Sequence, residues 1–232
     1  MRLPISLPKS ARSMWKRQSA PGAVPGTLHV DPTAPKPTIQ VLAYGPGGCI
    51  ERTVEDPQEL CEILPAWPVT WVNVEGLGDA TVLQKLGDVF DLHGLALEDV
   101  VNVHQRPKVD EYTDHLFIVA RMIYMNMHIE SEQLSIFLGT NFVLTFQSTP
   151  GGDCLNPLRD RIRRGLGRVR TLGADYLAYG ILDGVIDAYF PVLDVYSHEL
   201  DKLENEVLEN ATPRTVSRIQ RVKRNLLTLR RV

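Results

Sequence analysis

The sequence predicts an α+β fold, in which an α/β/α layered domain with a mainly antiparallel, mixed sheet is followed by long coiled-coil-like helices. Three observations support this prediction. Short runs of β-branched and aromatic residues separated by tight turns fill the middle of the chain, helical apolar spacing precedes and follows them, and the last third carries an unbroken helical repeat. Strands joined by short turns pair antiparallel, and helices on both sides of a sheet cover its faces.

Capping and turn residues delimit the elements before the strand block. Asp56 followed by Pro57 marks a helix start, because aspartate accepts hydrogen bonds from free N–H groups and proline suits the first helical position. That helix should end before Pro65, and Asp79 should cap the helix after it. The expected strands are 39–43, 49–54 and 69–74, with a turn at 45–48, and the expected helices are 57–64, 79–90 and 95–101.

The strand block contains four runs of strand composition, at 109–112, 116–127, 132–138 and 141–147. A Gly-Thr-Asn turn at 139–141 predicts a hairpin between the last two runs. A Gly-Gly-Asp stretch ends the block at 151–153, and a short basic helix is expected over 157–165.

A long helix is expected from about residue 175 to residue 209. Its apolar residues recur in alternating steps of four and three, which is the spacing of a coiled-coil seam. Pro191 interrupts this helix and predicts a kink near residue 188. Thr212 and Pro213 begin a second helix that meets no stop signal before Val232. The seam residues are Leu182, Ile186, Tyr189, Leu193, Tyr196, Leu200, Leu203 and Val207.

The two helices carry opposite charge. Residues 175–209 hold nine acidic residues and one base, whereas residues 210–232 hold seven bases and no acid. This division predicts an antiparallel hairpin, or a contact between subunits, in which the two charged faces meet. Asp194 and Asp201 are the acids expected to pair with the basic helix. Because the basic face is opposed by an acidic one, the pattern disfavours nucleic-acid binding.

Composition divides the chain into three parts. Residues 1–37 hold six bases, one acid and repeated prolines, which predicts a flexible basic arm, either without a partner or touching anionic lipid. Residues 38–170 are expected to form the α/β/α domain, and residues 171–232 a long helical hairpin.

Several function classes are disfavoured by what the sequence holds. The net charge of −3 gives no field for nucleic acid, and the three cysteines form no CxxC pair. No uninterrupted apolar run approaches the roughly 20 residues of a membrane span, so the given chain is expected to be soluble. No catalytic or phosphate-binding motif stands out, so no enzyme is expected.

Two groups of carboxylates are candidates for a metal site. Glu98 and Asp99 lie side by side among apolar residues, and carboxylate oxygens suit Mg2+, Ca2+ or Mn2+. A carboxylate stripe on the long helix includes Asp183 and Asp187, and Asp183 should be the less exposed because apolar residues surround it. The alternatives are a solvated helix turn for the first pair and pairing with the basic helix for the stripe. Histidines such as His104 form no metal-binding pattern.

Four ordered stretches go beyond these patterns, because they resemble the cytoplasmic region of the CorA family. Residues 95–119, LALEDVVNVHQRPKVDEYTDHLFIV, resemble its signature region. Residues 131–147, 157–194 and 199–231 match in the same order and at compatible spacing, so the resemblance covers most of residues 69–232.

The resemblance implies a function. The family forms homopentameric channels at the cell membrane that pass Mg2+ and often Co2+ or Ni2+, and Mg2+ bound between their cytoplasmic domains holds the pore closed. The chain would then be the part on the cytoplasmic face of the inner membrane and would end before the membrane helices and the Gly-Met-Asn motif. Two alternatives remain, a zinc transporter of the ZntB type and a soluble oligomerisation scaffold.

The resemblance also assigns roles by position. Asp99 resembles the Mg2+ ligand between subunits, Glu98 a ligand at a neighbouring secondary site, and Asp183 the helix carboxylate of that secondary site. His104 and Asp187 lie near these positions in the family's pattern. The opposing aspartate of the family would lie beyond Val232.

Overall fold

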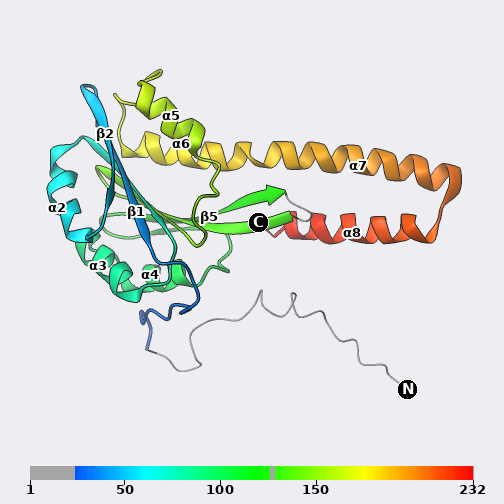
Figure 1. The fold of residues 1–232 in the computed structure, drawn as a ribbon, viewed down its shortest axis with the longest axis horizontal. Helices are drawn as coiled ribbons and strands as arrows, with labels where there is room; N and C mark the ends of the chain where they lie inside the picture. The colour runs from blue at the N-terminus through cyan, green and yellow to red at the C-terminus, as the bar shows by residue number, and fades with distance from the viewer. Residues whose placement is uncertain (1–23, 126–128, 232) are drawn as a thin grey trace.

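A computed structural model describes residues 24–125 and 129–231, which contain a seven-stranded sheet ordered β2-β1-β3-β7-β6-β5-β4 (Figure 1). Neighbouring strands are antiparallel except β3 and β7, which are parallel. The predicted mixed, mainly antiparallel sheet is therefore confirmed. The strands are β1 (Thr38–Gly45), β2 (Gly48–Val54), β3 (Val69–Glu75), β4 (Lys108–Glu111), β5 (Leu116–Met125), β6 (Ile129–Leu138) and β7 (Phe142–Gln147).

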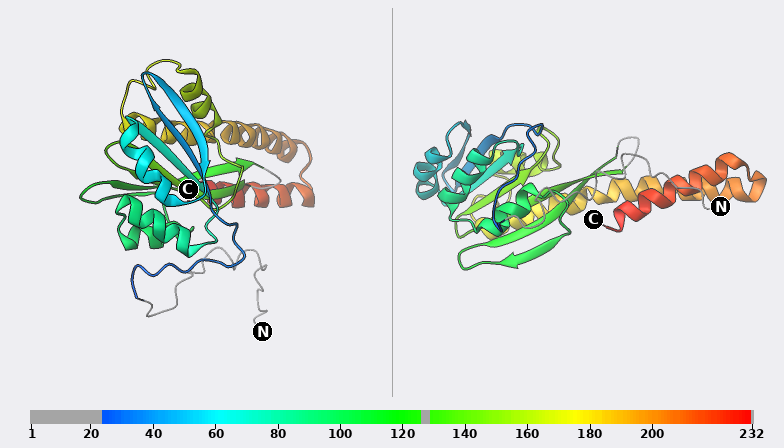
Figure 2. Two further views of the ribbon diagram at one scale, coloured as in Figure 1. Left: turned by 60° about the vertical axis from the view of Figure 1, so that its left-hand side comes forward. Right: turned by 90° about the horizontal axis from the view of Figure 1, so that it is seen from below.

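Helices cover both faces of the sheet (Figures 1 and 2). One face carries the short segment η1 (Pro57–Glu59), α2 (Leu60–Ile63) and η2 (Leu64–Ala66), followed by α3 (Ala80–Phe90) and α4 (Gly94–Val101). The opposite face carries α5 (Asn156–Arg164) and α6 (Ala174–Asp187). The chain then leaves the sheet as α7 (Tyr189–Asn210) and returns as α8 (Pro213–Leu229).

The strand alternation separates two hydrophobic cores. On β5, Phe117 and Val119 belong to the core beneath α3 and α4, whereas Ile118 and Ala120 belong to the core beneath α5 and α6. This follows from the period of two along a strand, which turns successive side chains to opposite faces. The central strands are thus buried on both faces, as the layered prediction requires, whereas the edge strands β2 and β4 are partly exposed.

The predicted capping residues confirm the helix starts. The Asp79 carboxylate accepts from the N–H groups of Thr81 and Val82, and Asp56 forms a capping box with Glu59. The helix expected over 57–64 is broken into two 3-10 turns around α2. Pro65 lies in the second of these turns, where proline cannot extend an α-helix.

The long helix breaks at Ala188, between α6 and α7, as Pro191 predicted. Proline has no N–H to donate to the carbonyl four residues earlier, so the helix yields just before it. Within the described residues, the combined stretch Ala174–Asn210 has the length and composition of a membrane span. Its first half, α6, packs against the sheet, which is also how a core helix of a soluble protein behaves.

Helices α7 and α8 form an antiparallel hairpin that projects from the sheet (Figure 1). Arg218 of α8 pairs with Glu199 at 2.9 Å and also with Glu206, and Arg221 pairs with Glu199 at 3.6 Å. The prediction that Asp194 and Asp201 make these pairs is wrong, because both are exposed and the face of α7 toward α8 carries the glutamates. Helix α8 ends at Leu229, and Arg230 and Arg231 form a turn.

Residues 24–37 lie against the layered region. Leu28 and Val30 pack against the core beneath α3 and α4. Gly76 has a φ of 93°, and a Cβ there would lie 2.5 Å from the Lys36 carbonyl oxygen, so only glycine allows this approach. The remainder of the predicted arm, residues 1–23, lies outside the described residues, and the division of the chain at residues 37 and 170 stays a prediction.

Candidate metal site

Helix α4 presents the first candidate carboxylates at one edge of the sheet. The backbone of Asp91 is left-handed, and the ring of His93 caps the helix by accepting from the Leu95 N–H at 3.2 Å. Ala96, Val100 and Val101 turn inward to the core. Glu98 and Asp99 follow one another on this helix, so their side chains point in different directions.

Asp99 is held by three side chains. Its Oδ2 accepts from the Lys108 ammonium at 2.6 Å, and its Oδ1 accepts from Gln105 Nε2 at 2.7 Å. Its backbone carbonyl accepts from Gln133 Nε2 at 2.8 Å, while Gln133 Oε1 accepts from the Gln105 N–H at 3.0 Å. The Asp99 side chain is 25% exposed. This carboxylate is therefore fixed in place, accessible to solvent and paired with the Lys108 ammonium.

Lys108 lies between two carboxylates at the start of β4. Its ammonium is 2.6 Å from Asp99 Oδ2 and 2.6 Å from Asp110 Oδ2, and it lies over the Phe117 ring, 5.5 Å from the centroid. Partial burial opposes the charge, but hydrogen bonds to Asp110 and Asp99 outweigh it and raise the pKa of Lys108. The ammonium is therefore positively charged at physiological pH.

Glu98 faces a different part of the molecule. It is 9% exposed, and its Oε2 accepts from the Gly26 N–H at 3.0 Å, which ties the segment before β1 to α4. His104 is exposed in the middle of the loop between α4 and β4. Desolvation of its ring and the nearby Arg121 cation hold the pKa of His104 below its ordinary value, so the ring is neutral near pH 7. A neutral imidazole is the form that binds metals.

The second pair of candidate carboxylates lies across the sheet. Asp183 and Asp187 are on α6, which packs on the face opposite α4. Asp183 is half-buried and Asp187 exposed, so the prediction that Asp183 is less accessible is confirmed. Within one chain the sheet therefore separates this pair from Glu98 and Asp99.

An apolar groove of about 650 Å³ lies between strands β4 and β5 and the junction of α6 with α7. Lys108 lines one wall, beside Pro107 and Val109, whereas Leu182 and Ile186 of α6 line the other. Neither Asp99 nor Asp183 is among the side chains that line this groove; Lys108 is the lining residue that contacts Asp99. Across residues 24–125 and 129–231, no three histidine, cysteine, aspartate or glutamate side chains come together as a metal-binding group. The ligand roles of Asp99, Glu98, Asp183, Asp187 and His104 stay predictions.

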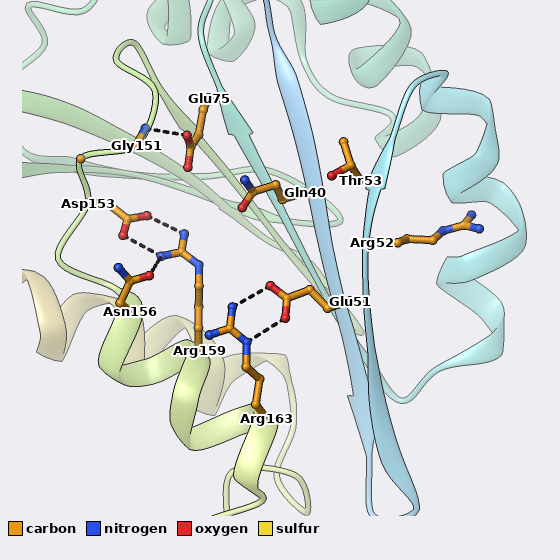
Figure 3. Close-up of a pocket in the computed structure, with 11 residues that line it drawn as sticks. Gln40, Glu51, Arg52, Thr53, Glu75, Gly151, Asp153, Asn156, Arg159 and Arg163 are labelled. Carbon is orange, nitrogen blue, oxygen red and sulfur yellow. Dashed lines mark hydrogen bonds and ion pairs between the residues drawn. The ribbon is translucent and has the colours of Figure 1, made fainter.

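A second polar feature, which the sequence did not predict, is a cavity of about 470 Å³ between β1, β2, β3 and α5 (Figure 3). Inside it the Arg159 guanidinium pairs with Asp153 through two bonds of 2.6 and 2.5 Å, and lies over the Trp71 ring. Arg163 pairs with Glu51 through two bonds of 2.7 Å. Each arginine already has a carboxylate: the Arg163–Glu51 pair fastens α5 to β2, whereas the Arg159–Asp153 pair joins α5 to the loop before it. In the sequence, only the basic run over 157–165 pointed to this arginine-lined cavity.

The comparisons with known proteins identify the family. The sequence profile described as "CorA-like Mg2+ transporter protein" matches residues 68–232. The chain belongs to this family. Because the family consists of ion transporters, the prediction that the chain is not an enzyme is confirmed.

One relative shares much of this sequence. A Thermotoga maritima protein named "Cobalt/magnesium transport protein CorA" is 40% identical over 221 residues, which are 93% of this chain. The chain spans 63% of that relative's length.

Solved structures show the same fold. The soluble domain of CorA from Methanocaldococcus jannaschii superposes with a TM-score of 0.64 at 18% identity, over 82% of this chain and 72% of that one. The cytoplasmic domain of ZntB from Vibrio parahaemolyticus gives 0.62 at 14% identity, over 84% and 73%. At such identities the likeness concerns the fold alone, and it confirms the predicted fold class of this CorA-family chain.

Proposed function

We propose that this chain is the cytoplasmic, metal-sensing part of a homopentameric channel for Mg2+ and Co2+, in which Mg2+ bound between subunits holds the pore closed. One observation carries the proposal. Asp99, on α4 beside the edge strand β4, is partly exposed and is fixed by the Lys108 ammonium and the amides of Gln105 and Gln133. Family membership and the Thermotoga relative's name supply the transported ions.

The donor atoms suit a hydrated Mg2+ ion. Mg2+ keeps several waters and needs only one or two carboxylates, so a site does not require a full set of side chains from one chain. Asp99 supplies an accessible carboxylate, and Glu98, which faces Gly26, supplies a more buried one to the neighbouring secondary site. When bound, the ion supplies positive charge that offsets repulsion between carboxylates of adjoining subunits.

The chain's own residues explain how such a site could act at a distance. Asp183 and Asp187 lie on α6, and α6 continues through Ala188 into α7 with only a short break. Tyr189, the first residue of α7, donates from its hydroxyl to the Arg121 carbonyl on β5 at 2.8 Å. A shift of the sheet edge relative to α6 would thus move the root of the hairpin.

The proposal places the chain on the cytoplasmic face of the inner membrane, joined to membrane helices of the full-length protein. The structures of a CorA soluble domain and a complete CorA from Methanocaldococcus jannaschii support this division into soluble and membrane parts.

The test is a Mg2+ titration of the full-length protein in detergent, followed by protection from limited proteolysis. The wild type should become resistant as Mg2+ rises, and Asp99→Ala should need at least about tenfold more Mg2+, because removal of a carboxylate ligand lowers affinity strongly. Asp114→Ala, which removes an exposed carboxylate from the β4–β5 turn, is the matched control. An identical Mg2+ response in Asp99→Ala and wild type would reject the proposed site.

A zinc transporter of the ZntB type is the second candidate, favoured by the fold shared with the ZntB cytoplasmic domain. Ion uptake into vesicles separates the two: Mg2+ and Co2+ flux supports the first candidate and Zn2+ flux without Mg2+ flux supports the second. Assembly that is unaffected by any divalent cation would instead support an oligomerisation scaffold.

A further inference from the structure

The Lys108 ammonium occupies the place beside Asp99 that a metal cation would need. It lies 2.6 Å from Asp99 Oδ2 and, on its other side, 2.6 Å from Asp110 Oδ2. Lys108 and Asp110 are two residues apart on β4, so their side chains share one face of the strand. One lysine therefore bridges the carboxylate of α4 and a carboxylate of the edge strand.

We infer that Lys108 is a built-in competitor of the divalent cation: its ammonium neutralises Asp99 when no metal is bound and sets the concentration at which the metal displaces it. This inference rests on the proposed function, because it concerns the same site. It adds Lys108 as a residue whose charge sets the affinity of the site for the divalent cation. It also assigns Asp110 as the carboxylate that holds the Lys108 ammonium after the metal has displaced it from Asp99.

The lysine is suited to leave Asp99. Its side chain is 32% exposed and its ammonium is a point charge on a flexible stem, unlike the fixed fork of an arginine. Asp110 is 40% exposed and close enough to hold the ammonium alone, so the charge would not have to move into solvent unpaired. Displacement therefore exchanges one partner for another, which keeps its cost small.

Asp99 itself is held by neutral groups that do not compete for charge. Gln105 donates to Oδ1, the oxygen that Lys108 does not use, and Gln133 donates to the Asp99 carbonyl. Gln133 is 2% exposed and also accepts from the Gln105 N–H. The carboxylate is thus positioned by the two amides, and only Oδ2 has to change its partner.

The size of the effect follows from the exposure of the pair. A partly exposed ion pair contributes about 1 kcal/mol, which corresponds to about a fivefold change in a binding constant. Removing the competitor should therefore tighten Mg2+ binding by about that factor. A built-in competitor would keep the site weak enough to respond to changing Mg2+ rather than remain filled.

The test compares Lys108→Met with Lys85→Met in the full-length protein. Lys85 lies on α3, on the same side of the sheet, and pairs with Asp56 at 3.2 Å, so its substitution removes the same charge away from Asp99. Calorimetry and protection from proteolysis each give the Mg2+ concentration of half-saturation. Lys108→Met should lower it about fivefold, and Lys85→Met should leave it unchanged. Lys108→Arg, which keeps the charge, should not lower it.

Asp110→Asn separates competition from a general effect of charge. In the wild-type background it should raise the half-saturating Mg2+ concentration, because Lys108 loses its second acceptor and stays on Asp99. In the Lys108→Met background the same substitution should have a much smaller effect. Equal shifts in both backgrounds would show that Asp110 acts only through its charge and would overturn the inference.

The failure of the inference and the failure of the proposed function give different results. If Asp99→Ala removes the Mg2+ response while Lys108→Met leaves half-saturation unchanged, the site stands and the competitor role is wrong. If Asp99→Ala leaves the response intact, both are wrong. Circular dichroism of each variant shows whether the fold is retained, and Lys108→Gln, which also removes the charge, supplies a second variant should Lys108→Met fail to fold.

Discussion

The layered region, β1 to α6, and the α7–α8 hairpin contain similar proportions of apolar residues but use them differently. Every residue of β3 is buried, and two continuous cores fill the space on either side of the sheet. The hairpin buries few large side chains, and a larger set of apolar residues on it is exposed. The exposed ones are Phe190, Leu193, Val195, Leu200, Val207, Leu208, Val216, Ile219 and Leu227.

This difference shows where the stability of the chain resides. The layered region is held by its own core, whereas the hairpin is anchored at its root, where Val192 and Tyr196 pack with Ile123 and Ile129 of the sheet. Beyond the root it relies on a small apolar contact that includes Leu203 and Val222, and on ion pairs between α7 and α8, which contribute little when exposed and weaken in salt. The hairpin should therefore open locally at a lower free energy than the sheet unfolds.

The largest expected difference between the regions concerns buried charge. The Asp153 side chain is 3% exposed and that of its partner Arg159 is 9% exposed. Asp153→Asn removes the negative charge of this pair and should lower the free energy of unfolding by about 3–5 kcal/mol. The reason is that the Arg159 guanidinium stays buried without its counter-charge. Urea unfolding followed by far-ultraviolet circular dichroism measures this loss.

The hairpin provides the contrast for that prediction. Glu199→Gln weakens the Arg218 and Arg221 contacts and should leave the urea midpoint of the layered region in place, while amide exchange in α7 and α8 becomes faster. A similar drop in midpoint for both variants would show that the hairpin and the sheet unfold as one unit.

The next largest effect is expected from the same substitution, leucine to alanine, at a buried position and at an exposed one. Leu144→Ala, at a fully buried position of β7, should cost about 2–5 kcal/mol because it leaves a cavity in the core. Leu208→Ala, at a position 77% exposed near the hairpin tip, should change stability by less than about 0.5 kcal/mol. Chemical denaturation of the two variants under the same conditions checks the pair. A large loss in Leu208→Ala would mean that the hairpin face is covered in solution.

The smallest expected effect is a pH dependence that belongs to the layered region. His115 is buried between Tyr112 and Phe137, and burial lowers its pKa from the ordinary 6.5, although Asp114 and Asp91 offset part of the shift. The unfolded chain therefore binds a proton more readily than the folded one. The contribution of His115 is complete above about pH 6.5 and is lost as the pH falls through its lowered pKa.

The melting temperature should accordingly fall on acidification, and His115→Gln should flatten that fall. His104→Gln is the companion variant, because the pKa of His104 is also lowered. Amide exchange at low pH should increase in the strands around His115 before it increases in the hairpin. An unchanged pH profile in His115→Gln would mean that other groups cause the acid sensitivity.

Local chemistry allowed much of the fold to be predicted. Asp56, Asp79 and Thr212 cap helices because side-chain oxygens satisfy N–H groups a few residues away, and Pro191 breaks a helix through its own backbone. The parallel pairing of β3 with β7 was not predictable in this way, because the two strands lie far apart in the sequence.

The candidate site shows the same limit. The sequence identified Asp99 and Asp183 as candidates, but not that the sheet separates them, because a face is fixed only when the topology is known. It also missed Lys108 as the partner of Asp99. The two residues meet because the loop between α4 and β4 folds back, and the sequence does not give the path of that loop. Arg218 pairs with Glu199 and Glu206 rather than with Asp194 and Asp201 because of the rotation of α7 about its axis, which the sequence does not give.

Strand β4 is the last strand in the sheet order, so one side of its backbone has no neighbouring strand within the described residues. Such an edge invites strands of other molecules to add to the sheet, and charged side chains are a common defence against this. The Lys108 and Asp110 pair therefore also makes it costly for a second copy to extend the sheet. Variants that remove both charges should be watched for fibrous aggregation as well as for altered cation binding.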